Sequence, residues 1–198
     1  MNEEYEFIPL QGSEARSFVV ELAQLRLKVF WDFPYLYEGT LEYEKNYLET
    51  YFKAQHSFVL LVKHRDTIVG ATTGILAAEE EPGFRKPFEE AGLDVRKVFY
   101  FGESVLLKEH RGLGIGKMFF QKREEYARTL GFVSTLSFCA VIRDDHHPLR
   151  PADYTPLDSF WRSQGFQPQA GMETSYEWLD RGQDKPTIKK MQYWIKAI

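Results

Sequence analysis

The 198-residue sequence contains one cysteine, Cys139, so it can form no internal disulfide and no metal site built from cysteine pairs. It also lacks long hydrophobic runs. The longest apolar stretches, such as 58–62 and 98–101, are far shorter than the roughly 20 residues of a membrane span. The N-terminus has no basic segment followed by an apolar one, as a secretory signal requires. We therefore expect a cytoplasmic protein with no membrane partner.

Positive charge is also scarce. Lys and Arg number 25 against 29 Asp and Glu, which gives a formal net charge of −4. A general nucleic-acid binder needs a clustered basic surface, so we expect no nucleic-acid partner. An acidic protein attracts a cationic small molecule rather than repelling it.

Apolar and aromatic residues are plentiful, at 43% and 16% of the chain. They are sufficient for a sizeable core and exclude global disorder. The length suits one domain, and no repeat, linker or low-complexity tract interrupts it. We therefore expect a single domain over residues 1–198.

The hydrophobic periodicity predicts alternating groups of strands and helices. Strands are expected over 5–10, 57–64, 68–78, 98–107, 132–142, 174–179 and 187–195, and helices over 13–31, 40–54, 84–91, 112–130 and 155–164. Thr40 is a candidate helix cap. Thr155 is another, with Pro156 at the first helical position and Asp158 completing a capping box. The mixed order predicts the α/β class, in the α+β form with a mixed sheet.

The most informative segment is Arg111-Gly-Leu-Gly-Ile-Gly116, where a predicted strand runs into a long helix. Glycines let backbone amides converge at the positive end of a helix, which forms an anion site that fits a pyrophosphate. A P-loop would need glycine at 111 and Ser or Thr at 118, and a dinucleotide fingerprint would need Gly or Ala at 117. The pattern Arg/Gln-x-x-Gly-x-Gly/Ala is matched by Arg111, Gly114 and Gly116; the alternative is a tight strand–helix turn without a ligand.

This pattern resembles motif A of the GNAT family of N-acetyltransferases. The order of elements is similar along nearly the whole chain, and the segment 160–166, which ends in Gly165-Phe166, is similar to the family's second signature. The resemblance implies a GNAT-like acyl-CoA N-acyltransferase fold with a central mixed, mostly antiparallel sheet flanked by helices. It also implies an N-acetyltransferase that uses acetyl-CoA as co-substrate and no metal.

Carried over to this sequence, the resemblance assigns two sets of backbone groups to the co-substrate. The turn would bind the pyrophosphate, and the preceding strand would hold the pantetheine arm and the acetyl carbonyl. The residues concerned are Arg111, Gly112, Leu113, Gly114, Ile115, Gly116 and Lys117 in the turn, and Val105, Leu106 and Leu107 on the strand.

The chemistry requires a proton acceptor, because an amine with a pKa of about 10.4 is protonated at neutral pH and only the neutral amine attacks a thioester. Glu103, on the predicted strand, is the candidate base; the alternative is a salt-bridged or surface glutamate. The family's usual acid is a tyrosine four residues before Gly165, where this chain has Trp161. Tyr154 could supply the missing hydroxyl, or be an ordinary loop tyrosine.

By the same resemblance, the loop between the first two helices covers the acceptor. Aromatic faces and carboxylates suit a cationic amine, and the candidates are Trp31, Asp32, Tyr35, Tyr37 and Glu38. A buried arginine, for instance Arg26 or Arg143, could invert this preference. We expect direct transfer to a small cationic amine, in a monomer or homodimer. The alternatives are a non-catalytic acyl-CoA-binding or sensing module, or a protein-lysine or N-terminal acetyltransferase.

Overall fold

The computed structural model describes residues 5–198, which build one seven-stranded sheet in the order β1-β2-β3-β4-β5-β7-β6. All neighbouring strands are antiparallel except β4 and β5, which run parallel. The mixed, mostly antiparallel sheet predicted from the sequence is therefore confirmed. The strands are β1 (Tyr5–Leu10), β2 (Ser57–His64), β3 (Thr67–Leu76), β4 (Val98–Leu106), β5 (Thr135–Val141), β6 (Gln167–Trp178) and β7 (Thr187–Ala197).

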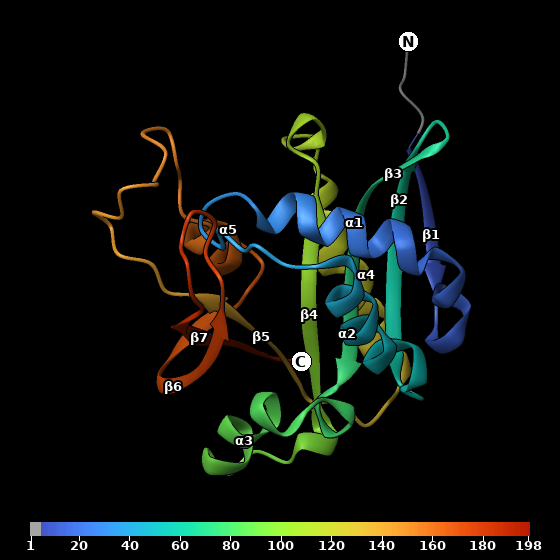
Figure 1. Ribbon diagram of the computed structural model, residues 1–198. Coiled ribbons are helices and arrows are strands. Elements are labelled where there is room, and N and C mark those ends of the chain that lie inside the picture. Colours follow the sequence, from blue (N-terminus) through green and yellow to red (C-terminus); the bar gives the residue numbers. More distant parts are fainter. Residues whose placement is uncertain (1–4) are drawn as a thin grey trace.

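Helices cover both faces of the sheet. In Figure 1, α1 and α2 lie in front of β2–β4, and α4 lies behind them. The helices are α1 (Val19–Phe30), α2 (Leu41–Lys53), α3 (Pro82–Glu90), α4 (Ile115–Thr129) and α5 (Asp158–Ser163). Within the described residues, no helix is long and apolar enough to cross a membrane.

Several predicted helix starts are wrong. The helix expected over 112–130 begins at Ile115, and the one expected over 84–91 begins at Pro82. The expected helix over 13–31 begins instead as a 3-10 segment, Gly12–Phe18, and becomes α-helical at Val19. Thr155 does not cap α5, which begins at Asp158 after Leu157. The start of α5 follows tertiary packing, because Phe160 and Trp161 pack on the aromatic core. The Thr40 cap is confirmed, since its Oγ1 accepts a hydrogen bond from the Tyr43 amide at 3.3 Å.

The parallel strands β4 and β5 pair only over residues 98–100 and 135–137. Beyond these pairs the two strands diverge (Figure 1), so the edge of β4 facing β5 has no strand partner from Phe101 onward. The register between β3 and β4 also shifts here, because Thr73 alone lies opposite both Gly102 and Glu103. The resulting β-bulge alters the direction of the side chains at the point where the strands part.

Candidate active site

The turn before α4 has the backbone geometry that its glycines permit. Gly112 has φ of 79° and Gly114, the N-cap of α4, has φ of 84°, a left-handed conformation that residues with a Cβ adopt at a cost. The backbone hydrogen bonds of α4 begin with the Met118 amide, which donates to the Gly114 carbonyl at 3.1 Å. The amides of residues 115–117 thus form the unpaired first turn of α4.

The surroundings of this turn are open and cationic. Apart from the adjacent residues, no described residue has an atom within 4 Å of the position that a Cβ would take at Gly112 or Gly114, so an anionic group could approach the backbone closely. Arg111 and Lys117 are exposed on either side, and Arg111 Nε donates to the Leu106 carbonyl at 3.0 Å. The unpaired amides, the open approach and these cations fit a pyrophosphate.

The predicted strand residues use their side chains for the core. Val105 and Leu107 are buried and Leu106 is half-buried, while the Leu107 amide donates to the Val69 carbonyl at 2.9 Å. Their contribution to a ligand would therefore come from backbone groups on the diverging edge of β4.

Glu103 lies at the bulge of β4 and is buried, with its side chain directed toward α1 and α2. Arg26 Nη1 of α1 lies 2.6 Å from Glu103 Oε2, and Arg26 Nε donates to Glu44 Oε2 of α2. Glu103 Oε1 is buried and has no hydrogen-bond partner among residues 5–198. Glu103 is therefore salt-bridged, as the alternative interpretation predicted. Its unpartnered Oε1 can accept a hydrogen bond from a further donor.

A single guanidinium serves two buried carboxylates in this cluster. Arg26 also packs on the rings of Tyr47 and Phe30, at 4.2 Å and 5.0 Å from their centroids. Burial by itself lowers the pKa of Arg26, but Glu103, Tyr47 and Glu44 raise it well above its ordinary value. With both glutamates ionised, the cluster carries a formal charge of −1, which favours a cation beside it.

A second buried arginine supports the bulge from the opposite face. Arg123 of α4 is 1% exposed, and its Nη1 donates to the carbonyls of Thr73 and Glu103 at 3.3 and 3.2 Å. Its Nη2 donates to Ser104 Oγ at 2.8 Å. These hydrogen bonds connect Arg123 to Thr73 on β3 and to Glu103 and Ser104 on β4. Arg123 therefore fixes the backbone that carries the Glu103 side chain.

The five predicted acceptor residues divide into two groups. Trp31, Asp32 and Glu38 are exposed, whereas Tyr35 and Tyr37 are half-buried. Burial raises the pKa of Tyr35, and the charges of Cys139, Arg26, Tyr154 and Glu103 also act on its hydroxyl. Burial and Glu44 likewise raise the pKa of Tyr37, so Tyr35 and Tyr37 are the residues of this loop that the structure brings to the Glu44–Arg26–Glu103 cluster.

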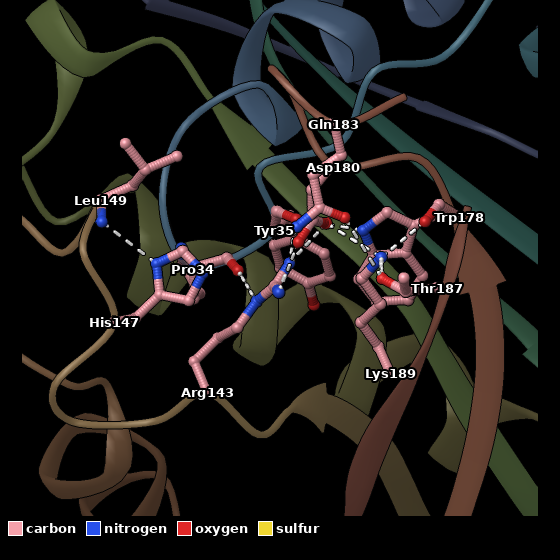
Figure 2. A network of polar contacts seen from close by, with 10 residues as sticks. All are labelled: Pro34, Tyr35, Arg143, His147, Leu149, Trp178, Asp180, Gln183, Thr187 and Lys189. Carbon is pink, nitrogen blue, oxygen red and sulfur yellow. Dashed lines mark hydrogen bonds and ion pairs between the residues drawn. The ribbon is translucent and has the colours of Figure 1, made fainter. Parts of the chain in front are cut away.

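The loop between α1 and α2 is held in place by Arg143, which follows β5 (Figure 2). Its Nε donates to the Pro34 carbonyl and its Nη2 to the Tyr35 carbonyl, both at 2.6 Å. The same guanidinium pairs with Asp180 at 2.8 Å, and Lys189 Nζ lies 3.1 Å from Asp180. This buried cluster therefore connects the loop to the region between β6 and β7.

A groove of about 370 Å³ opens beside this cluster, lined in part by Arg143, Asp180 and Lys189. Its two buried cations do not make it an anion site. Lys189 Nζ already donates to the Trp178 carbonyl at 2.5 Å and to Thr187 Oγ1 at 2.7 Å. Together with Asp180, these partners occupy all three ammonium protons.

The region of the predicted acid holds two different aromatic residues. Trp161 packs edge-on against Phe138 and Trp194, with centroids 5.1 and 5.0 Å apart. Tyr154 packs edge-on against Phe33 of the α1–α2 loop at 4.6 Å, and burial raises its pKa. Tyr154 thus keeps its proton at neutral pH and lies against the loop that carries Tyr35.

The unpaired amides at the start of α4 form an anion site, and β4 and β5 pair as parallel strands only over a short stretch. The sequence profile of the Acetyltransferase (GNAT) family matches residues 23–151, and the chain belongs to this family. It is an acetyl-CoA-dependent acetyltransferase, as the resemblance in the sequence implied.

Solved structures of the family have the same fold. The acetyltransferase of GNAT family from Streptococcus pneumoniae is 14% identical, with 98% of this chain and 100% of that chain covered and a TM-score of 0.60. Ribosomal-protein-alanine N-acetyltransferase from Brucella melitensis is 16% identical, with 96% and 99% covered and a TM-score of 0.62. Arabidopsis thaliana NAA60 in complex with acetyl-CoA is 15% identical, with 98% and 99% covered and a TM-score of 0.62. No curated protein sequence matches the chain.

Sequence reasoning missed the roles of Glu44 and Arg123. Both lie on the buried face of an amphipathic helix. Glu44 lies one turn before Leu48 on α2, and Arg123 lies one turn after Phe119 on α4. A charged residue on an otherwise apolar helix face was the available signal, because burying an unpaired charge is costly and implies a specific partner.

Proposed function

We propose that the protein transfers the acetyl group of acetyl-CoA directly to a small cationic amine. The observation that carries this proposal is the Glu44–Arg26–Glu103 cluster. Its two carboxylates share one guanidinium, and Glu103 Oε1 is buried without a hydrogen-bond partner. An ammonium group beside Glu103 would supply the missing donor and balance the formal charge.

Glu103 is the proposed base. Arg26 holds Oε2 and the bulge fixes the backbone, so Oε1 is the oxygen that takes the proton from the amine. The acetyl-CoA supplies the activated acetyl group. We assign its pyrophosphate to the amides of residues 112–117 with Arg111 and Lys117, and its pantetheine arm to the backbone of residues 105–107.

Tyr154 is the proposed proton donor to the departing thiol. Its raised pKa keeps the hydroxyl protonated at neutral pH, and it packs on Phe33 in the loop that contains Tyr35. Indole has no proton that it can give to a thiolate, so Trp161 is assigned to packing.

The α1–α2 loop is the proposed acceptor wall. Tyr35 and Tyr37 line its inner side, and burial, together with the nearby Glu44, raises the pKa of Tyr37. Trp31, Asp32 and Glu38 are exposed, and we assign them to the mouth of the acceptor site, where carboxylates attract a cation before it is desolvated.

Release of free thiol from acetyl-CoA tests this proposal, measured with a panel of amines of similar size. We expect turnover with cationic amines, little with anionic ones, and an acceptor KM that rises with salt. Preference for anionic amines, or an acceptor KM that falls with salt, would show that these carboxylates do not define the acceptor pocket. Turnover confined to peptides would favour the protein acetyltransferase, and CoA binding without turnover would favour the sensing module.

A further inference from the structure

The loop between α1 and α2 is paired with the chain segment that joins β6 to β7. Two backbone hydrogen bonds connect them, from the Glu38 amide to the Leu179 carbonyl at 2.8 Å and from the Arg181 amide to the Leu36 carbonyl at 2.7 Å. Between these bonds, Tyr37 and Asp180 form an isolated antiparallel bridge. The loop therefore takes its backbone position from a segment that is far away in sequence.

Side chains from outside the loop hold its preceding part (Figure 2). The carbonyls of Pro34 and Tyr35 each accept a hydrogen bond from Arg143 at 2.6 Å. The Tyr35 carbonyl also accepts one from Trp178 Nε1 at 3.1 Å. The rings of Tyr35 and Trp178 are stacked, with centroids 6.2 Å apart. Both the backbone and the ring of Tyr35 are thus positioned by residues that follow β5 or end β6.

Tyr35 is connected to the Arg26–Glu103 ion pair through one ring of α1. The Tyr35 ring packs on Phe30, with centroids 4.6 Å apart. The guanidinium of Arg26 lies 5.0 Å from the centroid of the same Phe30 ring, and it pairs with Glu103. A displacement of the loop would therefore change the position of Tyr35 relative to the proposed base.

Arg143 is not required to balance the charge of its own cluster. Asp180 accepts hydrogen bonds from Arg143 at 2.8 and 2.9 Å, and it also lies 3.1 Å from Lys189 Nζ. One ammonium neutralises one carboxylate, so the three side chains together carry a formal charge of +1. Because burying an excess charge is costly, charge balance gives no reason for the second cation. The hydrogen bonds from Arg143 to the loop do give one.

The two cations of this cluster hold different parts of the chain. Lys189 donates to the Trp178 carbonyl and to Thr187 Oγ1, which both lie in the β6–β7 hairpin. Arg143 instead joins Asp180 to the loop, because its planar guanidinium presents N–H groups in several fixed directions at once. Lys189 therefore stabilises the hairpin, and Arg143 attaches the loop to it.

We propose that Arg143 is a positioning residue for acetyl transfer, which fixes the α1–α2 loop so that Tyr35 and Tyr37 form the acceptor wall before the amine binds. The inference rests on the proposed acceptor wall. Arg143 acts through the backbone of the loop rather than on the reacting atoms. A wall that is already ordered spares the binding step the entropic cost of ordering it. Loss of Arg143 should therefore weaken acceptor binding rather than the chemical step or CoA binding.

Arg143→Met and Lys189→Met are a matched pair that tests this proposal. Each removes one cation and leaves Asp180 paired with the other, so the formal charge changes equally. Arg143→Met should raise the acceptor KM about tenfold, as for the loss of one hydrogen bond from a charged group. Its kcat and its dissociation constant for CoA should stay within about twofold of the wild type. Lys189→Met keeps the bonds to the loop and should resemble the wild type in all three constants.

Hydrogen exchange of the backbone amides tests the positioning without turnover. Arg143→Met should accelerate exchange in the loop segment 31–40, which includes the Glu38 amide, while exchange in α4 stays at the wild-type rate. Lys189→Met should leave both segments unchanged. Turnover of a cationic amine by the wild type tests the proposed function separately, because the exchange rates do not depend on which acceptor is used.

Four results would each overturn the proposal. They are a wild-type acceptor KM in Arg143→Met, an equal rise of this KM in both variants, loop exchange that Arg143→Met does not change, and loss of the fold in Arg143→Met. The second and the fourth would show that the whole charged cluster serves stability alone.

Discussion

Arg26 on α1 and Glu103 on β4 form a buried ion pair, with Nη1 of the arginine 2.6 Å from Oε2 of the glutamate. The contact joins α1, which precedes the proposed acceptor loop, to β4, which we propose holds the co-substrate. Because Glu44 of α2 binds the same guanidinium, the orientation of the proposed base depends on three elements that are far apart in sequence. Changes at Arg26 should therefore affect both stability and chemistry, whereas changes in the glycine turn should mainly affect CoA binding.

Gly114→Glu should abolish CoA binding and leave the fold intact. The new side chain would place bulk and negative charge where the pyrophosphate approaches, and calorimetry should detect no binding. Gly131→Glu is the matched control. Gly131, just after the other end of α4, also has a positive φ of 74° with nothing within 4 Å of a Cβ. It therefore carries a similar backbone cost of roughly 1–2 kcal/mol. Equal CoA affinity in both variants would contradict the assignment of the turn.

Glu103→Gln should lower kcat by roughly 10²–10⁴ while CoA affinity stays near that of the wild type. The defect should shrink at alkaline pH, where a larger fraction of the acceptor is free amine. Steady-state rates across pH check this, with Glu42→Gln, an exposed position on α2, as the control. A variant with the wild-type rate at every pH would show that desolvation or another group deprotonates the acceptor.

Arg26→Met should destabilise the protein by about 3–5 kcal/mol, because it leaves two carboxylates buried without their cation. Adding Glu44→Gln and Glu103→Gln removes the uncompensated charges, so the triple variant should regain most of the lost stability but not the activity. Denaturant titrations of the single and triple variants make the comparison. No recovery in the triple variant would mean that the ionic contacts themselves stabilise the fold.

Asp180→Asn should cost stability at neutral pH and less in acid. Burial alone raises the pKa of Asp180, but hydrogen bonds from Arg143 and Lys189 lower it below its ordinary value. The contribution of the ionised carboxylate is therefore complete above the unfolded pKa of about 3.9 and disappears as the pH falls through the lower folded value. Denaturant titrations at about pH 7 and pH 2.5 should show the gap between wild type and variant narrowing in acid. A gap independent of pH would exclude this linkage.

Local features of the fold could be predicted from the sequence where a single residue type determines the backbone conformation. Thr40 caps α2 where the pattern placed it, and Gly114 is the N-cap of α4 within the predicted glycine turn, although the helix begins later than expected. Thr155 has an equally good capping pattern, yet α5 begins three residues later because Phe160 and Trp161 fix its position through the core. A capping signal predicts a helix start only when packing does not place the helix elsewhere.

The sequence could suggest a candidate base on one strand, but it could not show which residues from other elements surround it. Glu103 could be selected from its position on the motif strand. Its partners Arg26 and Glu44 come from two helices, and no local pattern specifies which charged residues meet in the interior. Composition favoured Trp31, Asp32 and Glu38, which are exposed, because a cluster of aromatics and carboxylates looks the same in sequence whether it faces solvent or a ligand.

The short parallel pairing of β4 and β5 also has a mechanical consequence. The sheet consists of two leaves, β1–β4 and β5-β7-β6, joined along a seam of three residue pairs. Tyr100 spans this seam, with its hydroxyl 3.0 Å from the sulfur of Cys139. Arg143, which follows β5, donates to the carbonyls of Pro34 and Tyr35. These residues lie in the loop between α1 and α2, the helices that pack on β2–β4 of the first leaf. The loop between α1 and α2 thus connects the two leaves where β4 and β5 no longer pair. A motion that separates the leaves there would have to break the hydrogen bonds between Arg143 and this loop.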